Sequence, residues 1–166
     1  QTNENEIQDE KQAKNLLEKL LSDAVKRQML SDVPIGAFLS GGIDSSIIAA
    51  LMQSHSSKPI NTFTIGFSEA THDESVHAAS VASHLGTQHT KLNVSDSDAR
   101  DVIPYLPTMY DEPFADSSQI PTHLVCRAAS NHVTVALSGD GGDELFGGYN
   151  RYIYGPSLYQ KLRIFP

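Results

Sequence analysis

The chain has 166 residues, of which 39% are hydrophobic and 19% are charged, and its formal net charge is −8 at pH 7. This length and composition are typical of one folded domain and exclude an intrinsically disordered chain. The acidic balance, the lack of an apolar run of about 20 residues and the single cysteine predict a cytoplasmic protein that binds neither nucleic acid nor a membrane.

The first third of the chain predicts a helix, a buried strand and a second helix. We expect residues 1–15 to form a polar, flexible N-terminus and residues 16–166 to form the domain. Leucines at helical spacing between charged residues predict an amphipathic helix from about Glu10 to Leu30. The apolar run 34–39 predicts a strand, and the apolar positions of 43–53 predict a helix after a glycine-rich turn.

The remainder of the chain continues to alternate strands with helices. The expected elements are a strand over 60–67, a helix over 74–85 that ends at Gly86, a more polar strand over 87–94 near an edge, a partly helical region over 97–110 interrupted by Pro104 and Pro107, a loop over 111–118, a helix over 120–130 and a strand over 132–137. This alternation predicts an α/β fold with a doubly wound, mostly parallel sheet in a three-layer, Rossmann-like arrangement. Another apolar element begins at 163–166, so we expect the domain to be truncated at its C-terminus.

Residues 40–46, Ser-Gly-Gly-Ile-Asp-Ser-Ser, join the first predicted strand to the N-terminus of a helix. The two glycines permit backbone conformations in which successive N–H groups face one concavity, and the helix adds unpaired N–H groups and the positive end of its dipole. Together with the three serine hydroxyls, this loop predicts a cradle for phosphate or pyrophosphate. No lysine follows the glycines, so the loop is not a Walker A motif, and it suits attack at an α-phosphate with pyrophosphate leaving. The alternative is a tight turn with a serine N-cap.

A second glycine-rich segment, residues 138–148, follows the fourth predicted strand. In open α/β sheets, ligands bind beyond the carboxyl ends of the strands where the strand order reverses. If the first and fourth strands are neighbours, both loops open onto one crevice with Asp44 and Asp143 on opposite sides. Mg²⁺ commonly binds one or two carboxylates together with phosphate oxygens, so these acids predict a Mg²⁺ site. Alternatively, Asp143 and Glu144 only complement a helix dipole.

Four segments of the chain resemble one family. LSGGIDSS at 39–46 is similar to the pyrophosphate loop (PP-loop) of the N-type ATP pyrophosphatases. SGDGGDELFGGY at 138–149 resembles the asparagine synthetase branch of that superfamily, as do TFTIGF at 62–67 and DEPFADSSQIPT at 111–122. On these motifs the chain is identified as a member of the glutamine-hydrolysing asparagine synthetase family, over the N-terminal part of the synthetase domain.

The resemblance implies a carbon–nitrogen ligase. A carboxylate, aspartate in this family, would be adenylated by ATP with release of pyrophosphate, and ammonia from a glutaminase domain would then form the amide. Leu39 and Ile65 would contact the adenosine through backbone groups, Ser138 and Gly139 would contact the adenylate, and Asp140 would be the catalytic acid near it. The full-length form would be a homodimer.

The other site residues that the resemblance implies hold the phosphates and the metal. Asp44 and Asp143 would bind Mg²⁺. The pyrophosphate would lie on the first loop, on Ser40, Gly41, Gly42, Asp44, Ser45 and Ser46.

Three positions depart from the family pattern. Asp140 stands where glutamate is common, Ser117 stands where an arginine binds the substrate carboxylate, and Cys126 lies in an apolar helix, where we expect it in the core rather than as a nucleophile. Ser117 keeps open an amidotransferase that acts on a sugar acid or builds a β-lactam. Because the family's glutaminase and lysine-bearing helical parts do not match this chain, we expect it to be inactive on its own.

Two hypotheses come from other classes of protein. The first is a non-catalytic nucleotide-binding module, against which the intact acids Asp44 and Asp143 argue. The second is a pure interaction domain, which neither an aromatic stripe nor a basic patch supports.

Overall fold

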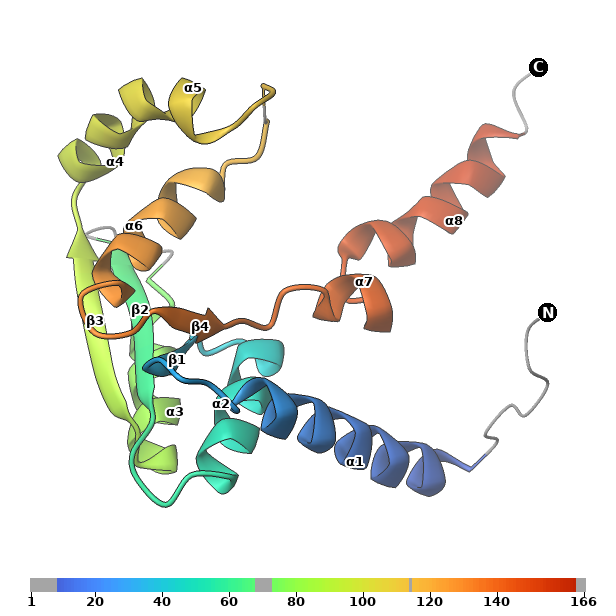
Figure 1. Ribbon diagram of the computed structural model, residues 1–166. Helices are drawn as coiled ribbons and strands as arrows, with labels where there is room; N and C mark the ends of the chain where they lie inside the picture. The colour runs from blue at the N-terminus through green and yellow to red at the C-terminus, as the bar shows by residue number, and fades with distance from the viewer. Residues whose placement is uncertain (1–8, 68–72, 114, 164–166) are drawn as a thin grey trace.

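The computed structural model describes residues 9–67, 73–113 and 115–163, and Figure 1 shows how their helices and strands are arranged. In chain order the elements are α1 (Glu10–Gln28), β1 (Ile35–Phe38), α2 (Ile43–Ser54), β2 (Asn61–Phe67), α3 (Ser75–Leu85), β3 (Gln88–Val94), α4 (Asp96–Val102), a 3₁₀ turn (Ile103–Tyr105), α5 (Leu106–Met109), α6 (Gln119–Ala129), β4 (Val135–Leu137), α7 (Gly142–Phe146) and α8 (Asn150–Leu162).

The strands form one parallel sheet. In the described part of the chain it has four strands in the order β3-β2-β1-β4, and each neighbouring pair is parallel. The chain builds outward from β1 through β2 to β3 and then returns to place β4 on the other side of β1. The strand order therefore reverses between β1 and β4, which confirms the predicted doubly wound α/β fold and the neighbouring first and fourth strands.

Helices cover both faces of this sheet, because side chains along each strand point alternately to opposite faces. Ala37 of β1 packs with Met52 of α2 on one face, whereas Phe63 of β2 packs with Ala129 of α6 on the other. Figure 1 shows α2 and α3 on one side of the sheet and α4 to α6 on the other. The result is the expected three-layer arrangement.

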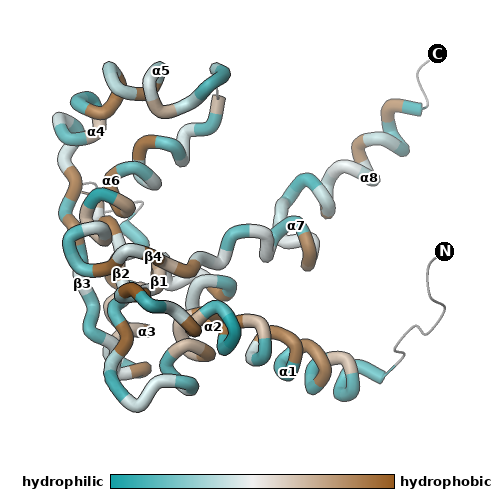
Figure 2. Tube along the Cα trace, in the orientation of Figure 1, coloured by the Kyte–Doolittle hydropathy of each residue, from teal (hydrophilic) through white to brown (hydrophobic). Residues whose placement is uncertain are grey.

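β3 lies at the sheet edge, as its alternating sequence predicts. Its burial pattern leaves Val94 as the buried residue of the strand, and Figure 2 shows the hydrophilic colouring along much of its length. An edge strand borders solvent, so polar residues are tolerated there at little cost.

The structure differs from the sequence-based expectation at several element boundaries. Residues 10–15, assigned to a flexible N-terminus, belong to α1, whereas residues 1–8 lie outside the described part. β4 begins at Val135 rather than at residue 132, because the N–H groups of His132 and Val133 donate back to the Ala129 carbonyl at the end of α6, both at 2.9 Å.

Prolines explain the other differences. Pro104 and Pro107 interrupt the 97–110 region as predicted, and each lies in the first turn of a new short helix, where its missing N–H is not needed. α8 was not predicted, because Gly155-Pro156 in its middle is typical of a helix end. The apolar element expected from 163 onward falls mostly on residues 164–166, outside the described residues.

In the described residues, no helix is both long enough and apolar enough to span a bilayer.

Candidate functional site

Two glycine-rich loops leave the sheet at the point where its strand order reverses. The first follows β1 and leads into α2, and the second follows β4 and leads into α7. Since β1 and β4 pair through Ala37 and Leu137 at their last shared register position, the two loops start side by side.

The first loop is closed by bonds among its own serines. The Ser40 and Ser45 hydroxyl oxygens lie 2.9 Å apart, and the Ser40 N–H donates to Ser45 Oγ at 3.2 Å. The Gly42 N–H donates to Ser40 Oγ at 3.2 Å, and Ser45 Oγ donates to the Gly42 carbonyl at 3.3 Å. These bonds tie Ser45, in the first turn of α2, back to Ser40 and Gly42.

The N-terminus of α2 has no side-chain cap. Gly42 is the N-cap residue. The first intrahelical bond runs from the Ser46 N–H to the Gly42 carbonyl at 3.1 Å. The N–H groups of residues 43–45 precede that bond and have no partner within the helix, so they are the groups that can donate to a phosphate.

The two loops touch each other at Asp44 and Ser45. A Cβ on Gly139 would lie 2.8 Å from the Ser45 nitrogen and 2.9 Å from Asp44 Cβ, and a Cβ on Gly142 would lie 2.6 Å from Asp44 Cγ. The backbone of the second loop therefore packs directly against the start of α2. The two loops are thus in contact, with Asp44, which is half-buried, between them, and a shared crevice for one ligand stays a prediction.

The acidic side chains of the second loop, Asp140 and Asp143, have other contacts than Asp44 has. The carboxylate of Asp143 contacts the Gly148 backbone at the far end of α7, whereas that of Asp44 contacts Gly142. Asp140 is exposed, and its Oδ2 accepts a 3.1 Å hydrogen bond from Ser138 Oγ. The structure thus brings Asp44 together with the loop that carries Asp143. Asp140 is exposed and is held by its hydrogen bond with Ser138.

β2 extends past the end of β1. β1 ends at Phe38, opposite Phe63, while β2 continues beside β3 as far as Phe67. The Leu39 N–H donates to the Phe63 carbonyl at 2.9 Å. Backbone groups of a strand point to alternate sides, so the N–H and carbonyl of Ile65 also point toward the side of β1, beyond its end. The Ile65 carbonyl accepts a 3.4 Å hydrogen bond from Thr64 Oγ1, and contact of these backbone groups with a ligand stays a prediction.

The donor set suits Mg²⁺ bound together with a polyphosphate. In the described residues there is no cluster of three or more His, Cys, Asp or Glu side chains that could hold a metal alone. Mg²⁺ is commonly bound by one or two carboxylates plus phosphate oxygens, and it retains several waters. Asp44 beside the uncapped end of α2 meets that requirement. The assignment of Mg²⁺ to Asp44 and Asp143 stays a prediction.

A hydrogen-bonded pair fixes the segment after α7. Tyr149 Oη donates to Glu144 Oε1 at 2.6 Å, and the Arg151 guanidinium lies 4.1 Å from the Tyr149 ring centroid. The hydrogen bond from Tyr149 lowers the pKa of Glu144, and the same bond raises the pKa of Tyr149. Glu144, read from the sequence as a dipole partner of α7, is thus also a tether for Tyr149.

Two features of this region were missed in the sequence. Gly142 has no special backbone angle, and its role as the contact for Asp44 is visible only in space. An ion pair between Lys91 of β3 and Asp73 before α3 joins residues too far apart along the chain to form a motif. Cys126, expected in the core, is exposed on α6, because the apolar side of that helix is carried by Leu124 and Ala129.

Comparison with known proteins identifies the family of the chain. Residues 16–166 match the Asparagine synthase family. The chain is 46% identical over 138 residues to a putative glutamine-hydrolysing asparagine synthetase 2 of Methanocaldococcus jannaschii, covering 82% of this chain and 27% of the relative. It is 44% identical over 131 residues to asparagine synthetase 1 of Bacillus subtilis, covering 78% of this chain and 20% of that relative. The chain thus spans about a fifth to a quarter of the length of these curated relatives.

Solved structures with the same fold are much more distant in sequence. An NH₃-dependent NAD synthetase from Campylobacter jejuni superposes with a TM-score of 0.56 at 14% identity, covering 82% of this chain and 60% of that structure. An NMN synthetase from Francisella tularensis superposes with a TM-score of 0.57 at 14% identity, covering 83% and 59%. At this identity the likeness supports the α/β fold alone.

Proposed function

The chain belongs to the asparagine synthase family, and from that premise we propose that it is the nucleotide-binding part of an ATP-dependent, amide-forming ligase. The observation that carries the proposal is the contact of the two glycine loops around Asp44 at the reversal of strand order. A site with uncapped helix N–H groups, hydroxyls and a carboxylate is suited to a metal-bound polyphosphate.

In this proposal the phosphates lie on the first loop and the adenosine lies against β2. The N–H groups at the start of α2 and residues 40–46 hold the β- and γ-phosphates, and Asp44 and Asp143 hold Mg²⁺, which neutralises phosphate charge. The backbone of Leu39 and Ile65 contacts the adenosine. Leu39 offers its carbonyl, since its N–H already donates to Phe63.

The proposed reaction joins a carboxylate to ammonia. A carboxylate oxygen forms a bond to the α-phosphorus of ATP while the bond to pyrophosphate breaks, and ammonia then displaces AMP from the acyl carbon. Ser138 and Gly139 contact the adenylate, and Asp140 is the catalytic acid beside it. Asparagine formation from aspartate, ammonia supplied by a glutaminase domain, and assembly as a homodimer belong to the same proposal for the whole protein.

A second acceptor remains part of the proposal because of Ser117. This residue is exposed in the turn before α6, where the family resemblance places an arginine. A serine hydroxyl cannot reproduce the two parallel hydrogen bonds of a guanidinium to a carboxylate. The acceptor is therefore aspartate or another carboxylate, such as a sugar acid.

Calorimetric titration of ATP tests the nucleotide site. We expect ATP to bind more tightly with Mg²⁺ than without it, because the net-negative chain places carboxylates at the phosphate cradle. AMP, which lacks the pyrophosphate portion, should show little dependence on Mg²⁺. Equal ATP affinity with and without the metal would contradict the proposed role of Asp44 and Asp143.

A further inference from the structure

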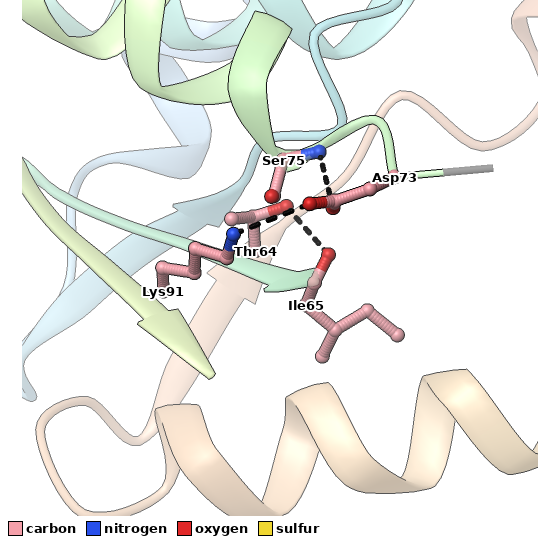
Figure 3. A network of polar contacts seen from close by, with 5 residues as sticks. All are labelled: Thr64, Ile65, Asp73, Ser75 and Lys91. Carbon is pink, nitrogen blue, oxygen red and sulfur yellow. Dashed lines mark hydrogen bonds and ion pairs between the residues drawn. The ribbon is translucent and has the colours of Figure 1, made fainter. Parts of the chain in front are cut away.

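A polar cluster joins Lys91, in the middle of β3, to Asp73, which lies just before the start of α3 (Figure 3). Lys91 of β3 is paired through Nζ with Asp73 Oδ2 at 3.3 Å. The two side chains are 36% and 16% exposed, less than the 73% and 82% of the Lys14–Glu10 pair on α1. No sequence motif includes these residues.

Asp73 connects this ion pair to α3. Its Oδ1 accepts a 3.1 Å hydrogen bond from the backbone N–H of Ser75, the first residue of the helix. One carboxylate therefore uses one oxygen to hold the helix start and the other to hold Lys91. Anything that moves Asp73 also moves the N-terminus of α3.

Gly66 provides the path for the lysine side chain. A Cβ at this position would contact Lys91 Cε and lie 2.8 Å from Lys91 Nζ and 2.9 Å from Ser75 Oγ. Lys91 therefore crosses the β2 backbone directly over Gly66 to reach Asp73. Ser75, which has no exposed surface, fills the space beside it.

The first turns of α3 form the wall behind the first glycine loop. A Cβ on Gly41 would lie 2.7 Å from the Ala78 nitrogen and 2.8 Å from His77 Cβ. Gly41 thus packs on the α3 backbone only a few residues after Ser75. A continuous set of contacts runs from Lys91 through Asp73 and α3 to Gly41.

We propose that Asp73 and Lys91 are positioning residues for the first glycine loop. Their ion pair fixes where α3 begins, α3 fixes Gly41, and Gly41 sets the curvature of the loop that holds pyrophosphate. This inference rests on the proposed function, because it assigns the pair a role in that same phosphate site.

The alternative role for Lys91 is direct attraction of the phosphates, and it predicts the opposite result for one variant. Asp73→Asn keeps an oxygen for the Ser75 N–H but removes the charge that pairs with Lys91. If Lys91 acted by direct attraction, freeing its ammonium would strengthen the binding of an anion. If the pair acts by positioning, Asp73→Asn weakens binding as much as Lys91→Met does.

The test is calorimetric titration of the whole chain with inorganic pyrophosphate and Mg²⁺, and separately with AMP. We expect Asp73→Asn and Lys91→Met each to weaken pyrophosphate binding by about three- to thirtyfold, and AMP binding to change by less than about twofold. The double variant should be no weaker than either single variant, because both remove the same contact. Lys91→Arg keeps the pair and should retain binding.

Two controls distinguish a positioning role of the Asp73–Lys91 pair from general unfolding and from a change in net charge. Lys58→Met removes an exposed lysine before β2, at the opposite end of the sheet, and should leave both ligands unaffected. Amide hydrogen exchange at Gly41 and Ala78 should be faster in Lys91→Met than in the parent chain even without ligand, while the other strands keep their protection.

Several outcomes would overturn the inference. Tighter pyrophosphate binding by Asp73→Asn, unchanged binding by both variants, or equal weakening of pyrophosphate and AMP each contradicts positioning through α3. A parent chain that binds neither ATP nor pyrophosphate contradicts the proposed function itself, and the unchanged exchange rate of Gly41 in Lys91→Met would then contradict the inference separately.

Discussion

Gly41 and Gly86 share a left-handed backbone but have different surroundings. Their φ angles are +85° and +71°. Gly86 ends α3, and a Cβ added there would meet nothing within 4 Å, whereas a Cβ on Gly41 would meet the α3 backbone. The two positions therefore separate the cost of an unfavourable φ from the effect of blocking the phosphate loop.

Gly86→Ala is expected to lower the unfolding free energy by about 1 kcal/mol through backbone strain alone. Gly41→Ala carries the same strain and also pushes the loop away from Ala78, so it should weaken ATP·Mg²⁺ binding by at least about tenfold, the scale of one lost charged hydrogen bond. Urea unfolding and nucleotide titration of both variants decide this. Equal nucleotide affinity in the two variants would place the phosphates elsewhere.

Asp44 is the residue on which metal dependence should rest. Asp44→Asn is expected to remove most of the effect of Mg²⁺ on ATP affinity and to leave AMP affinity nearly intact, because AMP has no pyrophosphate to share a metal with. Asp32→Asn, an exposed acid before β1, is the matched control and should behave like the parent. A collapse of AMP affinity in Asp44→Asn would show a structural role instead.

At the scale of elements, β3 is joined to β2 by a buried polar chain. Thr62 Oγ1 lies 2.8 Å from Thr87 Oγ1 and 2.9 Å from His89 Nδ1. In the described structure His89 Nε2 is buried without a hydrogen-bond partner. Burial lowers the pKa of His89 below its ordinary value of 6.5, since a charged imidazole would lose its hydration.

This histidine predicts a loss of stability in acid. The folded state resists protonation of His89 while the unfolded chain accepts it near pH 6.5, so the unfolded state binds more protons as the pH falls. The contribution of His89 to the unfolding free energy should be constant above that pH and decrease below it. His89→Gln should reduce this dependence, whereas His84→Gln, an exposed control on α3, should not. Parallel pH curves for the parent and His89→Gln would refute the assignment.

At the scale of the whole molecule, the candidate site is assembled from distant segments of the chain. The loops at 40–46 and 138–143 meet only because β4 lies beside β1, and the end of β2 lies on the other side of β1 from β4. A ligand that contacts all three binds the folded state and has no site in the unfolded chain. Binding and folding are therefore linked.

ATP with Mg²⁺ at about 100 times its dissociation constant should raise the unfolding free energy by about 2.7 kcal/mol. Urea denaturation with and without the ligand measures this. Gly41→Ala, with its blocked loop, should lose most of the increment, and Gly86→Ala should keep it. An increment that is the same in all three chains would mean that the nucleotide does not contact the first loop.

The sequence by itself determined the alternation of strands and helices, the glycine loops and the polar edge strand. These follow from local rules: the spacing of apolar residues, the ending of helices and strands at glycine and proline, and the alternation of polar and apolar residues over 87–94. The same rules failed at α8, where Gly155-Pro156 does not end the helix, and at the start of β4, where the end of α6 takes the backbone donors.

Only the tertiary structure decided which residues meet. The return of β4 to the side of β1 brings Gly139 and Gly142 onto Asp44, and β1 ends before it reaches the level of Ile65 in β2. The pairing of Lys91 with Asp73 depends on a lysine crossing Gly66 from a neighbouring strand. Such contacts join residues far apart along the chain, and they are set by strand order and register, which no local pattern of side chains specifies.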